Sequence, residues 1–250
     1  MRGHSSPGVD GLPAAFYQLA PSVFGECLQI VFDHQLRRGS LLRSQCSSAI
    51  TLVYKKGSRV DPGNYSPIAI TCVDVKVLSK VLAYRLQEML PKLIHEDQKV
   101  FLRGRSIHHY IRYMSDVQDL ITHRDEEANA TFHDFEKAYN GMDWSYMFAV
   151  LPKMNCGAVF IQSTKLQYTN TNVSLSLNGT LSPKITPYRG VKQGDPLSAV
   201  RFLMTIESLG NLLWRNIGPG ICITPTDTTT SLFFADESTL LSSSLSRGSA

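Results

Sequence analysis

Two groups of acidic side chains, about one hundred residues apart, each follow a short apolar stretch. Asp134 lies in FHDFEKAYN, and Asp236 and Glu237 lie in FFADES. A buried strand that runs into a carboxylate is costly unless the charge is paired or binds a cation. If the two stretches are neighbouring strands, Asp134 and Asp236 converge, and their hard oxygen atoms suit Mg²⁺. Two such ions about 3.5–4 Å apart promote phosphoryl transfer, although carboxylates at strand ends also commonly only meet solvent or cap a turn.

Basic residues are concentrated in two tracts of the first half. Residues 37–59 and 99–112 contain no Asp or Glu, and residues 1–125 carry 16 Lys+Arg against 11 Asp+Glu, a net +5. Residues 126–250 carry 9 against 10, a net −1. Such tracts form either a solvated face or a surface for a polyanion, because Lys and Arg dominate contacts with phosphates. A basic half beside an acidic one suits a metal-dependent enzyme that acts on nucleic acid.

Length and composition exclude several classes of protein. The 250 residues are 43% hydrophobic and 18% charged, which rules out wholesale disorder. No apolar run reaches the roughly 18 residues of a membrane helix, and the first residues lack the apolar core of a signal peptide. The five cysteines are an odd number without a C-x-x-C pair, which argues against a disulfide framework or a cysteine zinc site. We therefore expect an intracellular protein of the cytoplasm or nucleus, with no membrane partner; the sequence does not indicate an oligomeric state.

The elements that would position these residues are mixed in type. In the first half, helical spacing predicts a helix over 14–38, kinked or split at Pro21 and ended by Gly39. AITLVY (49–54) reads as a strand, followed by a basic loop. Residues 73–93 carry the clearest helical stripe, which we interpret as a core face.

The second half contains the predicted strands that lead to the carboxylates. We expect strands over 130–135 and 231–235, and a hairpin whose strands 173–177 and 181–186 are joined by Asn178-Gly179. A helix is predicted to begin near Pro196, with Asp195 as its cap. Because strands and helices follow one another without a regular βαβ repeat, the fold class is α+β.

Seven collinear segments resemble the reverse transcriptases of LINE-type (non-LTR) retrotransposons. These are SPGVDGLPAAFYQ, TLVYKKGSRVDPGNYSPIAI, KVLSKVLAYRL, PKLIHEDQKVFLRGRSI, FHDFEKAYNGMDW, YRGVKQGDPLS and LFFADES. The resemblance implies the fingers and palm of a right-hand polymerase, with an antiparallel palm sheet packed by helices. It implies a fingers region with interleaved palm helices over residues 1–125, and a palm region with the catalytic motifs over 126–250.

The resemblance also assigns roles in the palm. It identifies Asp134, Asp236 and Glu237 as catalytic, metal-binding carboxylates for Mg²⁺, with Mn²⁺ as a possible substitute. The backbone carbonyl of Phe135 would be a further ligand. Tyr139 matches an aromatic gate whose ring leaves no room for the 2′-hydroxyl of a ribonucleotide.

Further roles fall on turns and on basic residues. Gln193 and Gly194 match the turn that packs on the incoming base pair, and Lys55 and Lys56 match the basic pair that reaches over the triphosphate. The resemblance implies nucleic-acid contacts for Arg103, Arg105, Arg189 and Lys192. The reaction would be attack of a DNA primer 3′-hydroxyl on the α-phosphate of a dNTP, templated by RNA and driven by positioning and charge neutralisation.

Several positions depart from the family pattern. Ser66 stands where the family has an arginine expected to contact the phosphates of the nucleotide, and it offers neither charge nor a bidentate fork. Glu237 replaces an aspartate, Asn140 replaces another, and Val100 replaces a glycine. A β-branched residue such as Val100 does not readily adopt a positive φ.

The chain ends a few residues after LFFADES, which matches the second catalytic motif, so the resemblance implies a domain truncated after that motif. It therefore implies that the later palm elements and the thumb are absent, as is an upstream endonuclease, and that duplex binding is weak. Two functions remain open. One is an RNA-directed DNA polymerase core; the alternative is a catalytically inactive, decayed retroelement fragment that retains at most nucleic-acid binding.

Overall fold

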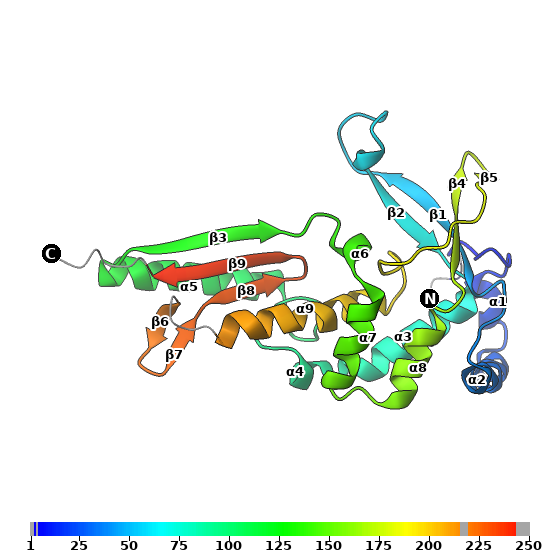
Figure 1. The fold of residues 1–250 in the computed structure, drawn as a ribbon, viewed down its shortest axis with the longest axis horizontal. Helices are drawn as coiled ribbons and strands as arrows, with labels where there is room; N and C mark the ends of the chain where they lie inside the picture. Colours follow the sequence, from blue (N-terminus) through cyan, green and yellow to red (C-terminus); the bar gives the residue numbers. More distant parts are fainter. Residues whose placement is uncertain (1–2, 4, 216–219, 244–250) are drawn as a thin grey trace. The chain divides into compact units, whose positions relative to one another are not determined.

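A computed structural model describes residues 3, 5–215 and 220–243 (Figure 1). The chain forms two compact units, and each is built from two separate segments. The first unit comprises residues 1–84 and 139–198, and the second comprises 85–138 and 199–250. The boundary predicted at residue 125 separates a fingers region from a palm region. That boundary concerns functional regions and stays a prediction.

The first unit is organised around a mixed sheet with strand order β2-β1-β4-β5. Its strands are β1 (Ser47–Tyr54), β2 (Tyr65–Ile70), β4 (Asn172–Leu177) and β5 (Thr180–Leu181). Strand β1 pairs antiparallel with β2 and parallel with β4, so segments more than one hundred residues apart lie side by side. Among the described residues, seven helices lie wholly or mostly in this unit. They are α1 (Ala14–Gln18), α2 (Pro21–Arg38), η1 (Pro62–Asn64), α3 (Val73–Gln87), α6 (Ala138–Gly141), α7 (Trp144–Lys153) and α8 (Ala158–Leu166).

The second unit contains the antiparallel sheet β3-β9-β8. Its elements are α4 (Leu90–Leu93), α5 (Ile107–Arg124), β3 (Ala128–Asp134), α9 (Ser198–Arg215), β6 (Ile221–Thr224), β7 (Asp227–Thr229), β8 (Ser231–Phe234) and β9 (Glu237–Ser243). Helix α5 presents an apolar stripe at helical spacing, including Tyr110, Met114 and Val117, and this stripe packs with Leu232 and Leu241 of the sheet. Strand β3 is an edge strand whose side chains are exposed from Asn129 onward, and Phe132 is 70% exposed.

Most predicted elements are present, with local differences. The helix expected over 14–38 is divided at Pro21, and Gly39 ends it with φ 75°. The helix expected over 73–93 ends at Gln87, and α4 begins a new turn at Leu90. Pro91 explains the break, because proline has no N–H and its ring clashes with the preceding helical turn.

The predicted hairpin is also present but shorter on one side. Asn178 (φ 49°) and Gly179 (φ 81°) form its turn, in agreement with the Asn-Gly signal. The prediction of a return strand over 181–186 was wrong in length, because β5 comprises only Thr180–Leu181. Beyond it, an isolated bridge joins Ile185 to Val173. Pro183 lies between these two points and cannot donate a ladder hydrogen bond.

Two further differences concern the second half of the chain. Helix α9 begins at Ser198 rather than near Pro196, and the Leu197 N–H donates to the Asp195 carboxylate at 3.3 Å. Strand β9 was not predicted, because its serine-rich sequence lacks a strong strand signal. Within the described residues, no helix combines the length and the hydropathy needed to cross a bilayer.

Candidate active site

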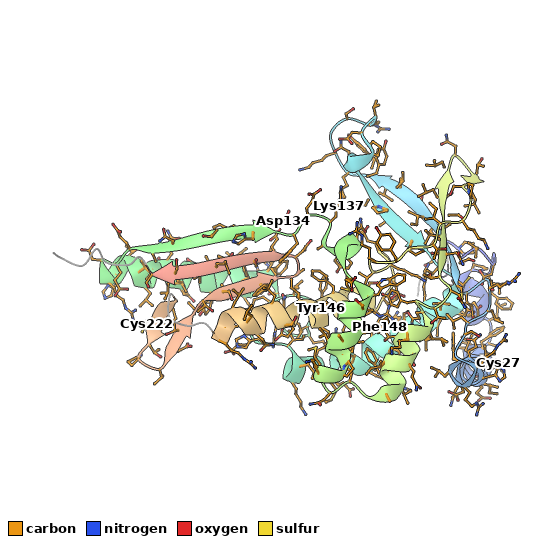
Figure 2. The ribbon with its side chains drawn as sticks, in the orientation of Figure 1. Cys27, Asp134, Lys137, Tyr146, Phe148 and Cys222 are labelled. Carbon is orange, nitrogen blue, oxygen red and sulfur yellow. The ribbon has the colours of Figure 1, made fainter. Side chains whose placement is uncertain are left out.

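The predicted metal-binding residues all lie at one end of the β3-β9-β8 sheet. Asp134 is the last residue of β3 (Figure 2). Its register partner is Glu237, the first residue of β9. The Phe135 N–H then donates to the Asp236 carbonyl at 3.1 Å. The two predicted strands are not direct neighbours, because β9 lies between β3 and β8. Asp236 therefore reaches this end of the sheet through the turn that joins β8 to β9.

The turn that carries Asp236 is held by a residue that the sequence alone did not single out. Ala235 adopts φ 58°, and its N–H donates to Oε1 of Gln98 at 3.1 Å. Gln98 is 1% exposed. The residues on either side of Gln98 in the chain are hydrogen-bonded to β8. The Lys99 N–H donates to the Phe233 carbonyl, and the Phe233 N–H donates to the Asp97 carbonyl. A polar glutamine inside PKLIHEDQKVFLRGRSI was the available signal, but its partner lies 137 residues away.

The chemistry of the three carboxylates fits a hard divalent cation. Asp134 and Glu237 are exposed and Asp236 is half-buried, and none of them forms an ion pair with a described Lys, Arg or His. Three oxygen donors without a protein cation match the preference of Mg²⁺ or Mn²⁺. Among the described residues, the trio whose ligand atoms all lie within 4.8 Å of one another is instead Asp10, Cys72 and Asp74. The carboxylates of Asp134, Asp236 and Glu237 are more widely spread than that.

In the first unit, the segment from Arg189 to Gly194 is fixed on both sides by backbone hydrogen bonds. The Gly190 N–H donates to the Met142 carbonyl at 2.7 Å, and the Val191 N–H donates to the Tyr139 carbonyl at 2.8 Å. On the other side, the Ala69 N–H of β2 donates to the Gln193 carbonyl at 2.8 Å. This segment therefore ties the start of α6 to the β2 edge of the sheet.

Two glycines make these close approaches possible. Gly190 has φ 88° and Gly194 has φ 102°. A Cβ on Gly190 would lie 3.1 Å from the Asn140 carbonyl oxygen, and one on Gly194 would lie 3.3 Å from the Ala69 carbonyl oxygen. Both positions therefore combine a left-handed backbone with tight packing, which favours glycine.

The side chains of this segment differ in their surroundings. Arg189 is exposed and its guanidinium lies 5.4 Å from the Tyr188 ring centroid. The Lys192 ammonium lies 3.5 Å from the Gln167 carbonyl oxygen. Gln193 is half-buried, and its Oε1 atom is inaccessible and has no hydrogen-bond partner. The structure thus places Arg189, Lys192, Gln193 and Gly194 in one segment. Tyr139 lies in α6, which is hydrogen-bonded to this segment.

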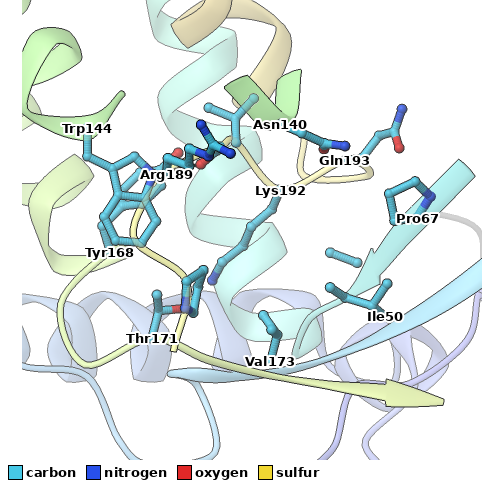
Figure 3. Close-up of a pocket in the computed structure, with 14 residues that line it drawn as sticks. Ile50, Pro67, Asn140, Trp144, Tyr168, Thr171, Val173, Arg189, Lys192 and Gln193 are labelled. Carbon is cyan, nitrogen blue, oxygen red and sulfur yellow. Dashed lines mark hydrogen bonds between the residues drawn. The ribbon is translucent and has the colours of Figure 1, made fainter. Parts of the chain in front are cut away.

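A cavity of about 280 Å³ opens beside this segment. Figure 3 shows the rings of Trp144 and Tyr168 on one wall and Ile50, Pro67 and Val173 on another. The two rings meet edge to face with centroids 4.9 Å apart, and the Trp144 indole N–H donates to the Gly190 carbonyl at 2.7 Å. The cavity is therefore mainly aromatic and aliphatic. Its polar lining consists of Asn140, Thr171, Arg189, Lys192 and Gln193.

Lys55 and Lys56 lie at the start of the turn between β1 and β2 and are both exposed. Two tyrosines build this turn: the Tyr54 hydroxyl donates to the Gly57 carbonyl at 2.6 Å, and the Tyr65 hydroxyl donates to the Arg59 carbonyl at 2.8 Å. The Lys55 N–H also donates to the Asn64 carbonyl. The backbone is thus held in place while both ammonium groups face solvent.

The second basic tract is partly used inside the protein. Arg105 donates to the carbonyls of His95 (2.5 Å) and Gln98 (2.7 Å), and burial lowers the pKa of its guanidinium. Lys99 forms an ion pair with Asp97 at 3.4 Å. Arg103 is exposed. Arg105 thus supports the loop that carries Gln98, and a contact with nucleic acid stays a prediction for Arg103 and Arg105.

Comparison with known proteins identifies the family. Residues 53–249 match the family described as reverse transcriptase (RNA-dependent DNA polymerase). The chain belongs to this family. The non-LTR resemblance is also confirmed, because the similar proteins are named for such elements.

Two curated relatives illustrate the likeness of this reverse transcriptase domain. It is 27% identical over 217 residues to the transposon TX1 uncharacterized 149 kDa protein of Xenopus laevis, covering 87% of the chain and 17% of that protein. It is 22% identical over 237 residues to the Pol polyprotein from a type-1 retrotransposable element R2 of Nasonia vitripennis, covering 95% of the chain and 22% of that protein. The chain thus spans less than a quarter of the length of either relative.

Solved structures with a similar fold include two yeast telomerases. The telomerase of Candida tropicalis, in complex with a fragment of telomeric RNA, has a TM-score of 0.57 at 11% identity, covering 89% of this chain and 40% of that one. The corresponding complex from Candida albicans has a TM-score of 0.55 at 11% identity, covering 92% and 43%. The expected α+β fingers-and-palm fold of a polymerase is confirmed.

The departures of this reverse transcriptase domain from the family pattern occupy defined places. Ser66 lies in β2 opposite Val53, Asn140 lies in α6 beside Gly190, and Glu237 opens β9. The concern about Val100 is not supported, since the residue with positive φ is Phe101 (φ 57°) and not Val100. A valine at position 100 is therefore compatible with the observed backbone.

Proposed function

We propose that this chain provides the catalytic core of an RNA-directed DNA polymerase that adds dNTPs to a primer 3′-hydroxyl on an RNA template. The observation that carries the proposal is the pairing of β3 with β9, which sets Asp134 opposite Glu237 and next to the Asp236 turn. In a chain of the reverse transcriptase family, this pairing gathers oxygen donors from two distant segments. Such a set of donors is what phosphoryl transfer with divalent cations requires.

In this proposal the carboxylates of Asp134, Asp236 and Glu237 hold Mg²⁺, or Mn²⁺ in its place, with the Phe135 carbonyl as a further donor. Bound divalent ions supply neutralisation of the charge that develops on the phosphate oxygens. The contribution of the chain is to hold the donors in place through the β3–β9 ladder and the Gln98 contact to the turn. Positioning of this kind provides a large part of the catalysis of phosphoryl transfer.

Other residues would bind and select the nucleotide. We infer that the Tyr139 ring excludes a ribonucleotide by steric contact, and that the Gln193-Gly194 turn packs on the base pair. Lys55 and Lys56 would contact the triphosphate, because their ammonium groups are free to face an anion. Residues that would contact the phosphates of primer or template are Arg103, Arg105, Arg189 and Lys192.

Primer extension on an RNA template with Mg²⁺ or Mn²⁺ tests the proposal directly. Asp134→Asn removes one charged donor with little change in volume, and we expect incorporation to fall by about 100-fold or more. Asp116→Asn is a matched control, because Asp116 is an exposed carboxylate on α5 of the same unit. Equal incorporation by wild type and Asp134→Asn would refute the metal-site assignment.

Wild-type activity itself is expected to be low because of the substituted positions. Restoring Ser66→Arg, Asn140→Asp and Glu237→Asp together adds a phosphate-binding guanidinium and one carboxylate, and it shortens a second carboxylate by one methylene. We expect this variant to incorporate more nucleotide than the wild type, and its extra activity should disappear when Asp134→Asn is added. No gain in activity would place the defect elsewhere in the chain.

A second candidate function is binding of nucleic acid without catalysis. The supporting observation is that the cations of the first basic tract, residues 37–59, are all exposed and form no ion pair with a described residue. Such a surface needs no metal site. It would serve a decayed member of the family that still binds nucleic acid.

A further inference from the structure

Gly190 is held by hydrogen bonds on both its N–H and its carbonyl. The N–H donates to the Met142 carbonyl at 2.7 Å, and the carbonyl accepts from the Trp144 indole N–H at 2.7 Å. An isolated antiparallel bridge joins the adjacent residues Asp143 and Arg189. The start of α7 and the residues just before it therefore fix the backbone at Gly190.

The backbone on either side of this point carries two residues proposed to select the nucleotide. The Val191 N–H donates to the Tyr139 carbonyl at 2.8 Å, and the Gln193 carbonyl accepts from the Ala69 N–H at 2.8 Å. Tyr139 lies in α6, which has four residues and is too short to be stable as an isolated helix. The position of Tyr139 relative to Gln193 therefore depends on tertiary contacts such as those of Gly190.

The Trp144 indole is packed on one side and faces a cavity on another. Its ring meets the Tyr168 ring edge to face at 4.9 Å, and the Phe148 ring, one turn further along α7, lies 5.9 Å from the same tyrosine ring. The cavity of about 280 Å³ beside the indole is not filled by side chains (Figure 3). Because close packing would otherwise fix a side chain from all sides, the hydrogen bond to Gly190 has a larger share in orienting this indole.

We propose that Trp144 is a positioning residue for nucleotide selection, which acts through the Gly190 carbonyl on the position of Tyr139 relative to the Gln193-Gly194 turn. This inference rests on the proposed function, in which the Tyr139 ring excludes the ribose 2′-hydroxyl and the turn packs on the base pair. Two nucleotides that differ by one oxygen are separated sterically only if the excluding ring is held to within about 0.5 Å. A displaced segment would both weaken the contacts with a dNTP and leave room for the extra hydroxyl.

Trp144→Phe tests the inference, because it keeps an aromatic ring and removes the N–H donor. Primer extension on an RNA template gives kcat/KM for a dNTP and for the matching rNTP. We expect the ratio of the two values to fall by about tenfold, with the KM for the dNTP rising more than kcat falls. A variant that is only less stable would lower both values equally, since the ratio does not depend on the amount of folded protein.

Two further variants accompany it. Trp214→Phe is the matched control, because the Trp214 indole N–H also donates to a backbone carbonyl, that of Ser231 at 3.2 Å, in the second unit. It should leave the ratio within about twofold of wild type. Gly190→Ala disturbs the same contact from the other side, since its Cβ would lie 3.1 Å from the Asn140 carbonyl oxygen at a φ of 88°. It should lower the ratio as Trp144→Phe does.

Amide hydrogen exchange tests the contact without turnover. In Trp144→Phe the amides of Gly190, Val191 and Ala69 should exchange about tenfold faster than in the wild type, whereas the amides of β9 should keep their rates. If the wild type incorporates no nucleotide, the proposed function is refuted, and exchange still decides whether Trp144 positions the segment.

Either measurement can overturn the inference. Unchanged exchange at these amides in Trp144→Phe does so, and so does a dNTP-to-rNTP ratio equal to that of Trp214→Phe in a chain that incorporates nucleotide. Should Trp144→Phe not fold, an unchanged ratio or unchanged exchange in Gly190→Ala overturns it instead.

Discussion

Glu207 is a buried acid whose charge state depends on the fold. It lies on α9 and is 5% exposed, and its Oε1 atom accepts a hydrogen bond from the His95 N–H at 2.8 Å. Burial raises the pKa of Glu207 from 4.5 to about 7, although the His95 N–H and the Arg105 guanidinium act in the opposite direction. The folded protein therefore holds this proton over a pH range in which the unfolded chain has lost it.

The raised pKa of Glu207 predicts a specific dependence of the free energy of unfolding on pH. Because the pKa of the folded state lies above that of the unfolded state, the Glu207 contribution falls as pH rises from about 4.5 to about 7, and the loss is complete above that range. Glu207→Gln keeps an acceptor for the His95 N–H but cannot ionise. Between about pH 5 and pH 8, urea unfolding should show the wild type losing up to roughly 3 kcal/mol more stability than the variant. Identical pH profiles would contradict the assignment.

At the scale of elements, the β8–β9 turn combines a left-handed backbone with a buried side chain. Ala235 has φ 58° and is 6% exposed, and the next residue is Asp236. A left-handed conformation costs an L-residue about 1–2 kcal/mol, and a β-branched residue considerably more. The hydrogen bond to Gln98 and the strand pairing on both sides hold the turn against this cost.

Substitutions at Ala235 should therefore distinguish the effect of side-chain shape from the effect of strain in the left-handed backbone. Ala235→Val is expected to destabilise the protein by more than about 2 kcal/mol, because the added methyls worsen the left-handed backbone in a buried site. Ala235→Gly should be nearly neutral, since relief of the backbone is offset by greater chain entropy and loss of a buried methyl, each about 1 kcal/mol. The matched control is Ala130→Val on the exposed strand β3, expected to change stability by less than about 0.5 kcal/mol. A fully stable Ala235→Val would show that the turn tolerates a β-branched residue.

The same elements explain what the sequence could and could not predict. Apolar runs before Asp134 and Asp236 predicted β3 and β8, because hydrophobic stretches that end in turn residues are a local signal. Strand β9 and Gln98 were missed, since the pairing of a serine-rich strand and a contact across 137 residues depend on tertiary structure. The family motifs supplied the candidate residues, and the geometry added how Asp236 reaches the end of β3.

At the scale of the whole molecule, the two basic tracts differ in availability. The cations of residues 37–59 are exposed, whereas Lys99 and Arg105 of the second tract are engaged by Asp97 and by backbone carbonyls. The first tract is therefore the stronger candidate for a nucleic-acid surface. Its charge does not depend on the carboxylates of the candidate metal site.

Binding of an RNA–DNA duplex at several salt concentrations should reveal this independence. We expect Asp134→Asn to retain the affinity and salt slope of the wild type. Arg37→Ala with Arg38→Ala should make the slope shallower by about 1.8, or about 0.9 for each phosphate contact. An affinity of the wild type that does not change with salt would remove the electrostatic basis of the second candidate function.

The exposed edge of the palm sheet has a practical consequence. Strand β3 pairs with β9 on one side only, and along its other edge the backbone N–H and C=O groups find no strand partner among the described residues. A long, open edge with an exposed Phe132 can add a strand from another copy of the chain, which is a common route to aggregation. Concentrated samples should therefore self-associate through β3, and a lysine at position 132 would act as a gatekeeper against it.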